Sequence, residues 1–255
     1  MMQAVFVGVG ESCDERLPNT SILVEEDAEG RNRSVLLDCG FTVPCQYWRH
    51  RSDPEALDGL WISHFHGDHF FGVPALLLRL WEMKRRKPLL ILGQNGIQQL
   101  VEKVMDLAYP SFRQKLTYAL DFMEMEPGKP VRVLGWTWQS AENEHGQRSF
   151  AVRIEGRGKS LFYSGDGRPT EATLALARHC DLLIHEAYQI NHATFGHGTV
   201  EGCIAFARSA RAPVLAVVHL QRDLRRDRFQ DVLAMLKEVQ DFRAYLPEPG
   251  DVLEF

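Results

Sequence analysis

Several features that mark other protein classes are missing from this sequence of 255 residues. No apolar run is long enough to cross a membrane, and the run at residues 4–9 is too short for the hydrophobic region of a signal peptide. No linker rich in proline, glycine and serine, no low-complexity tract and no internal repeat divides the chain. We therefore expect a cytoplasmic protein in which residues 1–255 form a single domain around one large core.

An excess of positive charge is also missing, since the net charge is −5 at pH 7. The chain therefore has no general attraction for nucleic acid, whose phosphates usually require a basic face. Two local basic clusters, at residues 84–87 and 222–228, are interpreted as solvated helix ends. The five cysteines include no C-x-x-C pair, which argues against both a disulfide framework and a zinc knuckle.

The pattern of apolar residues predicts strands and helices that alternate along the chain. Strands are expected at residues 3–9, 21–25, 34–38, 60–62, 89–92, 131–138, 150–155, 160–164, 182–184 and 214–218, with a polar turn at 29–32. Helices are expected at residues 44–50, 73–86, 97–108, 171–178, 200–210 and 227–239. Strands cluster in each half with helices between them, which predicts an α/β fold of two sheets packed face to face, a four-layer α/β/β/α sandwich.

The densest group of candidate metal ligands is Ser63-His64-Phe65-His66-Gly67-Asp68-His69. Histidine is the commonest nitrogen ligand of zinc, and aspartate adds an anionic oxygen. A tight loop at a strand end can aim His64 and His66 at one point and Asp68 and His69 at a neighbouring one, and Gly67 permits the turn between them. A solvated loop or an adventitious site is the alternative, but four ligands at H-x-H-x-D-H spacing favour a site for two metal ions.

Two metal ions need more than four ligands, and three further candidates lie beside predicted strands. His145 precedes a strand, Asp166 follows one, and His219 directly follows the strand at 214–218. Each alone could be a surface residue, a turn former or a strand end. Together they complete a site in which His64, His66 and His145 hold one metal, Asp68, His69 and His219 hold the other, and Asp166 bridges them.

These motifs resemble those of the metallo-β-lactamase superfamily and, more closely, those of ribonuclease Z and its phosphodiesterase relatives. The resemblance extends along nearly the whole chain through Leu36-Leu37-Asp38-Cys39-Gly40, residues 63–74, residues 164–169, His185-Glu186-Ala187, Gly196-His197-Gly198-Thr199 and His219-Leu220-Gln221-Arg222. It implies that Glu186 and His197 form an acid–base relay beside the metals. It also implies a homodimer, for which Phe70, Phe71 and residues 76–81 are candidate contacts unless they fill the core. The remaining histidines, His50, His179, His185 and His192, match no ligand position.

Two departures from ribonuclease Z argue against tRNA processing. The bacterial short forms that process tRNA carry a protruding arm between the third metal motif and the S-G-D strand. Only residues 147–163 lie between the His145-Gly146 pair and Ser164, which is enough for a hairpin and no arm. The loop Glu11-Ser12-Cys13-Asp14-Glu15-Arg16 is also more acidic than a contact with a phosphate backbone favours.

The motifs together predict a binuclear hydrolase, in the first place a phosphodiesterase acting on a small or cyclic nucleotide diester or on an RNA end. Its cofactors would be two divalent ions, zinc by default, with manganese or iron also compatible. Asp68 would hold the nucleophilic water, His197 would protonate the leaving alkoxide, and Arg222 and the backbone around Ser164 would contact the phosphate. The alternatives are hydrolysis of a lactone, thioester or sulfate ester, a silent metal-binding or RNA-contact module, and a tRNA 3′-endonuclease.

Overall fold

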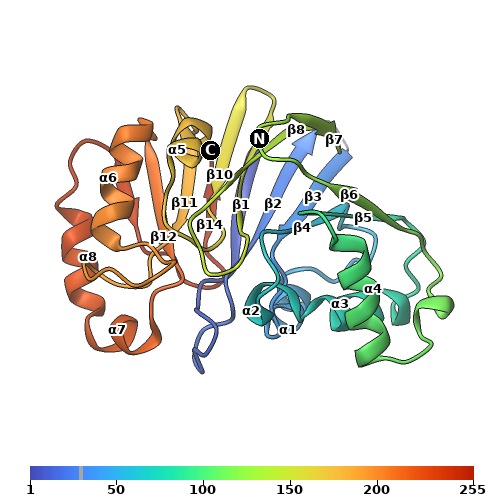
Figure 1. The fold of residues 1–255 in the computed structure, drawn as a ribbon. Helices are drawn as coiled ribbons and strands as arrows, with labels where there is room; N and C mark the ends of the chain where they lie inside the picture. Colours follow the sequence, from blue (N-terminus) through green and yellow to red (C-terminus); the bar gives the residue numbers. More distant parts are fainter. Residues whose placement is uncertain (29–30) are drawn as a thin grey trace.

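Two β-sheets form the centre of the structure (Figure 1). The computed structural model describes residues 1–28 and 31–255, so residues 29 and 30 of the predicted turn lie outside the described residues. The first sheet contains, in spatial order, β14 (Val252–Glu254), β1 (Met2–Gly8), β2 (Ser21–Ala28), β3 (Arg31–Leu37), β4 (Gly59–Ile62), β5 (Leu89–Gly93) and β6 (Leu120–Glu124). The second contains β13 (Arg243–Tyr245), β12 (Val214–Val218), β11 (Leu182–Glu186), β10 (Lys159–Tyr163), β9 (Phe150–Gly156), β8 (Trp136–Glu142) and β7 (Val131–Val133).

One apolar layer lies between the two sheets. It contains Val24 and Trp61 from the first sheet together with Trp138 and Ile154 from the second, all fully buried. The rings of Trp61 and Trp138 approach with centroids 6.3 Å apart, so the layer is closed by direct contact across the sheets. Burial of side chains this large supplies the main driving force for the face-to-face packing.

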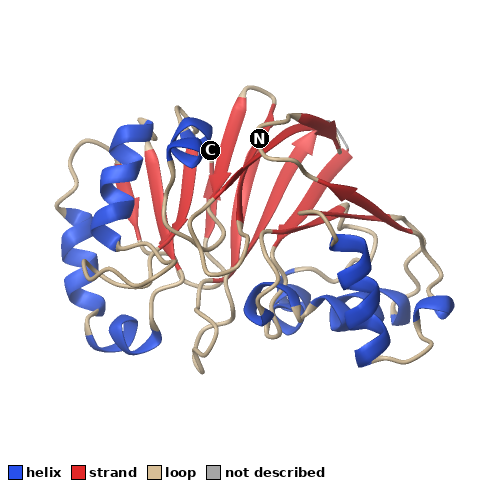
Figure 2. Ribbon diagram, in the orientation of Figure 1, coloured by secondary structure: helices blue, strands red, loops and turns tan. Residues whose placement is uncertain are grey.

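Helices cover the outer face of each sheet (Figure 2). The first group comprises α1 (Val43–His50), α2 (Gly67–Phe70), α3 (Val73–Glu82) and α4 (Ile97–Ala108). The second comprises α5 (Glu171–Ala177), α6 (Val200–Ala210), α7 (Arg222–Asp227) and α8 (Phe229–Lys237). This confirms the predicted four-layer α/β/β/α arrangement. Among the described residues, no helix combines the length and apolarity needed to cross a bilayer.

The end of α3 corrects two sequence predictions. The helix ends at Glu82 and not at residue 86, because Lys84 turns the chain with a φ of +68°. Arg85 then points inward, is fully buried, and donates hydrogen bonds to the carbonyl oxygens of Pro54, Leu57, Lys87 and Pro88. The guanidinium therefore ties this turn to the neighbouring loop, and the interpretation of residues 84–87 as a wholly solvated cluster is wrong for Arg85.

The single strand predicted at residues 131–138 is two strands, β7 and β8, which pair antiparallel. Leu134 and Gly135 both have positive φ and make the turn between them. The sequence predictions also missed β6, β13 and β14 and the short helices α2 and α7. These strands contain at most five residues, and β6 and β13 have no fully buried position, so they lack the apolar pattern that a prediction requires.

Parallel pairing brings the chemically important residues to one region of each sheet. Strands β3 to β6 pair parallel, and so do β10 to β13. Asp38 and His64 come after β3 and β4, whereas Asp166 and His219 come after β10 and β12. The carboxyl ends of parallel strands lie at the same edge of a sheet, which is where such folds place their sites.

Candidate metal centre

The His-rich segment leaves β4 and enters α2 within a few residues. His64 is fully buried at the end of the strand, His66 precedes the helix, and Asp68 and His69 lie inside it. The helix backbone packs tightly on Gly40, because a Cβ built at this glycine would lie 1.8 Å from the carbonyl oxygen of Asp68. Only glycine at position 40 therefore allows α2 to present Asp68 and His69 toward His64.

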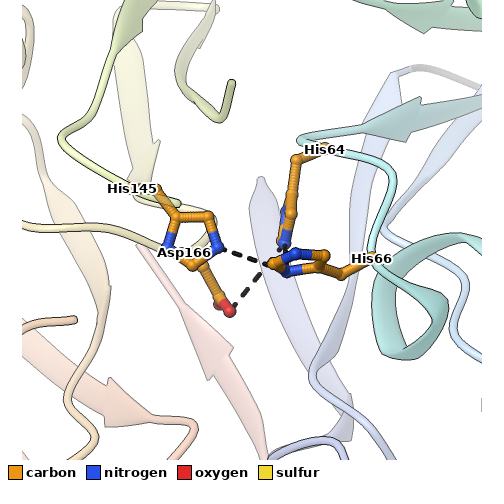
Figure 3. A group of neighbouring side chains, drawn as sticks. All are labelled: His64, His66, His145 and Asp166. Carbon is orange, nitrogen blue, oxygen red and sulfur yellow. Dashed lines mark hydrogen bonds and ion pairs between the residues drawn. The ribbon is translucent and has the colours of Figure 1, made fainter. Parts of the chain in front are cut away.

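The first group of candidate ligands contains His64, His66, His145 and Asp166 (Figure 3). His66 Nδ1 lies 3.0 Å from His64 Nε2 and 3.2 Å from His145 Nε2. His145 Nδ1 must carry its proton, because it donates to the carbonyl oxygen of Gly196 at 2.6 Å. The lone pair of Nε2 therefore faces the other two rings, as metal coordination requires. Burial lowers the pKa of His64 well below its ordinary value, so this imidazole is neutral at pH 7.

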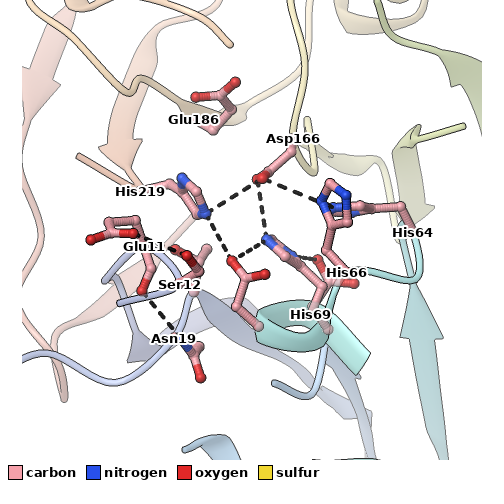
Figure 4. A network of polar contacts seen from close by, with 12 residues as sticks. Glu11, Ser12, Asn19, His64, His66, His69, Asp166, Glu186 and His219 are labelled. Atoms are coloured by element: carbon pink, nitrogen blue, oxygen red, sulfur yellow. Dashed lines mark hydrogen bonds and ion pairs between the residues drawn. The ribbon is translucent and has the colours of Figure 1, made fainter. Parts of the chain in front are cut away.

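The second group contains Asp68, His69, Asp166 and His219. Figure 4 labels His69, Asp166 and His219 of this group. His69 Nε2 lies 3.2 Å from Asp166 Oδ1 and 3.3 Å from Asp68 Oδ2, and His219 Nε2 lies 3.4 Å from Asp166 Oδ2. Burial lowers the pKa of His219, but the charges of Asp166 and Asp68 raise it to about 9. The same two carboxylates would favour a divalent cation at this place, and binding it requires the neutral imidazole.

The donor set fits divalent metal ions. Among the described residues, His69 Nε2 and Asp166 Oδ1 are buried with no hydrogen-bond partner, although they lie only 3.2 Å apart. Buried polar atoms without partners are costly, and a cation between these two atoms would satisfy both. The structure brings together all seven residues that the sequence singled out as ligands, and Asp166 belongs to both groups as predicted for a bridging carboxylate.

A carboxylate that the sequence predictions did not assign to the site supports both groups. Asp38 is fully buried and accepts hydrogen bonds from Ser63 N, Ser63 Oγ, His69 Nδ1 and Tyr163 Oη at 2.7 to 2.8 Å. Since Ser63 donates its one hydroxyl hydrogen to Asp38, His64 Nδ1 can donate to Ser63 Oγ at 3.0 Å. One carboxylate therefore orients His69 directly and His64 through Ser63, and leaves Nε2 of both rings free.

Backbone strain is present at two of these positions. Asp38 has a φ of +62° and His219 a φ of +64°, in the left-handed region that residues other than glycine adopt uncommonly, although aspartate, asparagine and histidine do so more often than most. His219 N donates to the carbonyl oxygen of Val9 at 2.9 Å, which holds the residue in place. The sequence contained a signal for Asp38, because Asp38-Cys39-Gly40 follows a strand as Asp166-Gly167 does.

Glu186 and His197 lie beside the second group. Glu186 Oε1 accepts hydrogen bonds from Gly167 N at 3.0 Å and Gly198 N at 2.8 Å, and lies 3.3 Å from His197 Nδ1. Burial lowers the pKa of His197, but the close approach of the Glu186 carboxylate raises it above the ordinary value. The pair, together with His219, offers ligand-type atoms within 4.8 Å of one another. The predicted proximity of Glu186 and His197 to the candidate metal ligands is therefore found.

A cleft of about 380 Å³ opens over these groups, lined by Glu11, Ser12, His66, Gly67, Asp68, Asp166, Tyr188, His197 and His219. Arg222 reaches its edge, where it donates to Glu11 Oε1 at 2.8 Å. Glu11 also accepts from Ser12 Oγ and Cys13 N, so it organises the acidic loop and neutralises Arg222. This pairing weakens the interpretation of Arg222 as a free phosphate contact.

The side chain of Ser164 faces the protein interior. Ser164 is fully buried. Its hydroxyl donates a hydrogen bond to Gly165 O at 2.6 Å and accepts one from Glu186 N at 2.9 Å. The hydroxyl therefore links the backbone of Gly165 to that of Glu186, and Ser164 is not among the residues that line the cleft. Of the four unassigned histidines, His185 is buried and bonded to Glu186 O, His50 is partly buried, and His179 and His192 are exposed.

Comparison with known proteins identifies the family. The family described as "Anti-Pycsar protein Apyc1" matches residues 2–241. The chain belongs to this family. This Apyc1-family chain is also 27% identical to a ribonuclease Z of Methanosarcina acetivorans, with 86% of the chain and 88% of that protein covered.

Two solved structures share the fold. YhfI from Bacillus subtilis, a metallo-β-lactamase fold protein, superposes with a TM-score of 0.79 at 22% identity, covering all of both chains. The short form of human tRNase Z superposes with a TM-score of 0.77 at 21% identity, covering 99% of this chain and 98% of that one. The predicted metallo-β-lactamase fold and the resemblance to ribonuclease Z are thus confirmed. These likenesses support a hydrolase, and the His and Asp cluster can hold metal.

Proposed function

We propose that this Apyc1-family protein is a binuclear metal-dependent phosphodiesterase that hydrolyses a small or cyclic nucleotide diester or an RNA end. The observation that carries the proposal is the position of His197, which lines the same cleft as ligands of both groups and lies 3.3 Å from Glu186. A proton donor at this place serves a reaction whose leaving group is a poor alkoxide, as in an unactivated phosphodiester.

The first ion would be held by His64, His66 and His145, the second by Asp68, His69 and His219, and Asp166 would contribute to both. When bound, two such ions would lower the pKa of the attacking water and neutralise charge on the phosphate. The mixture of imidazole and carboxylate favours zinc, with manganese or iron as alternatives.

Asp68 and His197 would handle the protons of the reaction. Asp68 is buried at the lining of the cleft, and His69 and His219 hold its pKa far below the ordinary value against the effect of burial. It therefore stays a carboxylate that can orient the attacking water by accepting a hydrogen bond. His197 retains its proton at higher pH than a free histidine, because Glu186 stabilises the charged ring. It can donate this proton to the departing oxygen.

The surroundings of the cleft favour a small substrate over tRNA. Strands β9 and β10 are joined by Arg157 and Gly158 alone, where tRNA-processing relatives carry an arm. Glu11, at the entrance, already neutralises Arg222, so little positive charge remains there for a long phosphate backbone. A tRNA 3′-endonuclease remains the second candidate, because the curated relative at 27% identity bears the name ribonuclease Z.

The test is hydrolysis of bis(p-nitrophenyl) phosphate, of cyclic nucleotides and of a 3′-extended precursor tRNA by protein loaded with zinc or manganese. We expect metal-dependent turnover of the small diesters that Asp68→Ala abolishes. Activity on a panel of lactones, thioesters and sulfate esters that exceeds the activity on diesters would show that the protein is a hydrolase of a different class. Fewer than two ions per chain without turnover would indicate a silent metal-binding module.

A homodimer and a single catalytic domain over residues 1–255 stay predictions. Of the proposed dimer contacts, Phe70, Leu76, Leu77 and Leu80 are buried in the core of this chain, whereas Phe71 is exposed. The candidate dimer surface is therefore much smaller than the apolar sequence suggested.

A further inference from the structure

A phenylalanine close in sequence to His197 has most of its side chain exposed to water. Phe195 is 76% exposed, compared with 57% for Phe71 and 51% for Phe41, the other large exposures of this residue type among the described residues. It occupies the turn Thr194-Phe195-Gly196-His197 and stands two residues before the proposed proton donor. Single exposed apolar residues are common, so exposure by itself gives Phe195 no role.

The turn that carries Phe195 is held on both sides. His197 N donates to Thr194 O at 3.2 Å, and Gly196 has a φ of +70°, as the third residue of a type II turn requires. Arg168 Nη2 donates to Thr194 O at 2.9 Å, and His145 Nδ1 donates to Gly196 O at 2.6 Å. The ring is thus presented to solvent by a rigid backbone, which reduces the entropy that a ligand contact would cost.

The ring also lies at a defined place relative to the ligands. A Cβ built on Gly146 would be 3.7 Å from Phe195 Cε1, so the ring packs beside the residue that follows His145. The rings of His145 and His197 have centroids 5.1 Å apart. The Phe195 ring therefore lies beside the residue that follows one candidate metal ligand, and its backbone is two residues from the proposed proton donor.

We propose that Phe195 is the stacking platform for the nucleobase of the substrate, and that the protein therefore selects diesters that carry a base. The inference rests on the proposed phosphodiesterase function. A nucleotide carries its base one sugar away from its phosphate, so a phosphate at the ligand groups places the base near the rim. The lining of the cleft is mostly charged and polar, and Phe195 offers the exposed apolar face that a base stacks on.

The experiment compares a 3′,5′-cyclic nucleotide with the 3′,5′-cyclic phosphate of the same sugar without a base. KM and kcat are measured for four metal-loaded proteins: the parent, Phe195→Ala, Phe195→Trp and Phe195→Leu. For the nucleotide we expect KM to rise about tenfold in Phe195→Ala, with kcat within about twofold, because stacking contributes to binding. For the nucleotide, Phe195→Trp should have the KM of the parent, whereas Phe195→Leu should have the raised KM of Phe195→Ala. The abasic substrate should give the same KM for all four proteins.

Leu107→Ala is the matched control, because Leu107 is 73% exposed and lies on α4, away from the cleft. An equal rise in KM for both substrates, or full restoration by leucine, would overturn the stacking role. A change in oligomeric mass on Phe195→Ala would show that the ring covers a second copy, and would also overturn it.

Failure of the proposed function is distinguishable from failure of this inference. If the parent hydrolyses neither substrate, the phosphodiesterase proposal fails, and binding of a nucleoside monophosphate by calorimetry then decides the role of Phe195. Weaker binding to Phe195→Ala, restored by tryptophan, supports the platform. Equal binding to the parent and to Phe195→Ala refutes it.

Discussion

Replacement of Asp38 by asparagine should weaken metal binding at both ligand groups. Three donors, Ser63 Oγ, His69 Nδ1 and Tyr163 Oη, converge on Oδ2, and Ser63 N approaches Oδ1. An asparagine must turn its oxygen toward the three donors, which leaves its NH2 group facing Ser63 N–H. The substitution is otherwise mild, because asparagine tolerates the φ of +62° found at this position.

The size of the effect follows from what is lost. The variant loses one hydrogen bond and the negative charge behind His69, which should lower the free energy of unfolding by about 2–3 kcal/mol. Removing a carboxylate that orients a ligating histidine typically weakens metal affinity about 10–100-fold. We expect this loss for both ions, because Asp38 supports His69 directly and His64 through Ser63.

The assay is competition of the metal-loaded protein with a chelator of known affinity, read by metal analysis at a temperature where every variant is folded. Tyr163→Phe is the matched control, since it removes one hydrogen bond to Asp38 but keeps the carboxylate and its contact with His69. Ser63→Ala should weaken mainly the ion held by His64. If Asp38→Asn keeps two ions with affinities within about threefold of the parent, the reasoning is refuted.

Three further predictions follow from the site and the core. Glu186→Gln should lower kcat on an alkyl diester about 10²-fold or more but affect a p-nitrophenyl diester much less, with metal content unchanged. Because His197 must carry its proton to act as the donor, kcat should fall as the pH rises through the pKa of His197. Glu186 raises this pKa, so Glu186→Gln should move the fall in kcat to lower pH, and a pH–rate profile of both proteins is the test. Arg85→Ala should cost about 3 kcal/mol of unfolding free energy by leaving buried carbonyls unpaired, whereas exposed Arg86→Ala should change it by less than about 0.5 kcal/mol in a denaturant titration.

The arrangement of the ligands could be predicted from the sequence because each candidate stands next to a strand end. His64, Asp166 and His219 follow short apolar runs that the sequence predicts as buried strands, and parallel strands end at a common edge. The helices at Ile97–Ala108 and Val200–Ala210 were predicted to the residue for a similar reason, since one apolar face repeats along each.

Features that depend on distant contacts could not be predicted in this way. Arg85 looks like a solvated cation in sequence, and only the loop that folds against it supplies the carbonyls that it binds. Asp38 has an apolar neighbourhood in the chain, and its partners Ser63 and Tyr163 are 25 and 125 residues away. Local patterns thus specify which side chains end strands, whereas hydrogen bonding in a buried site depends on the packing of the two sheets, which no short stretch of sequence contains.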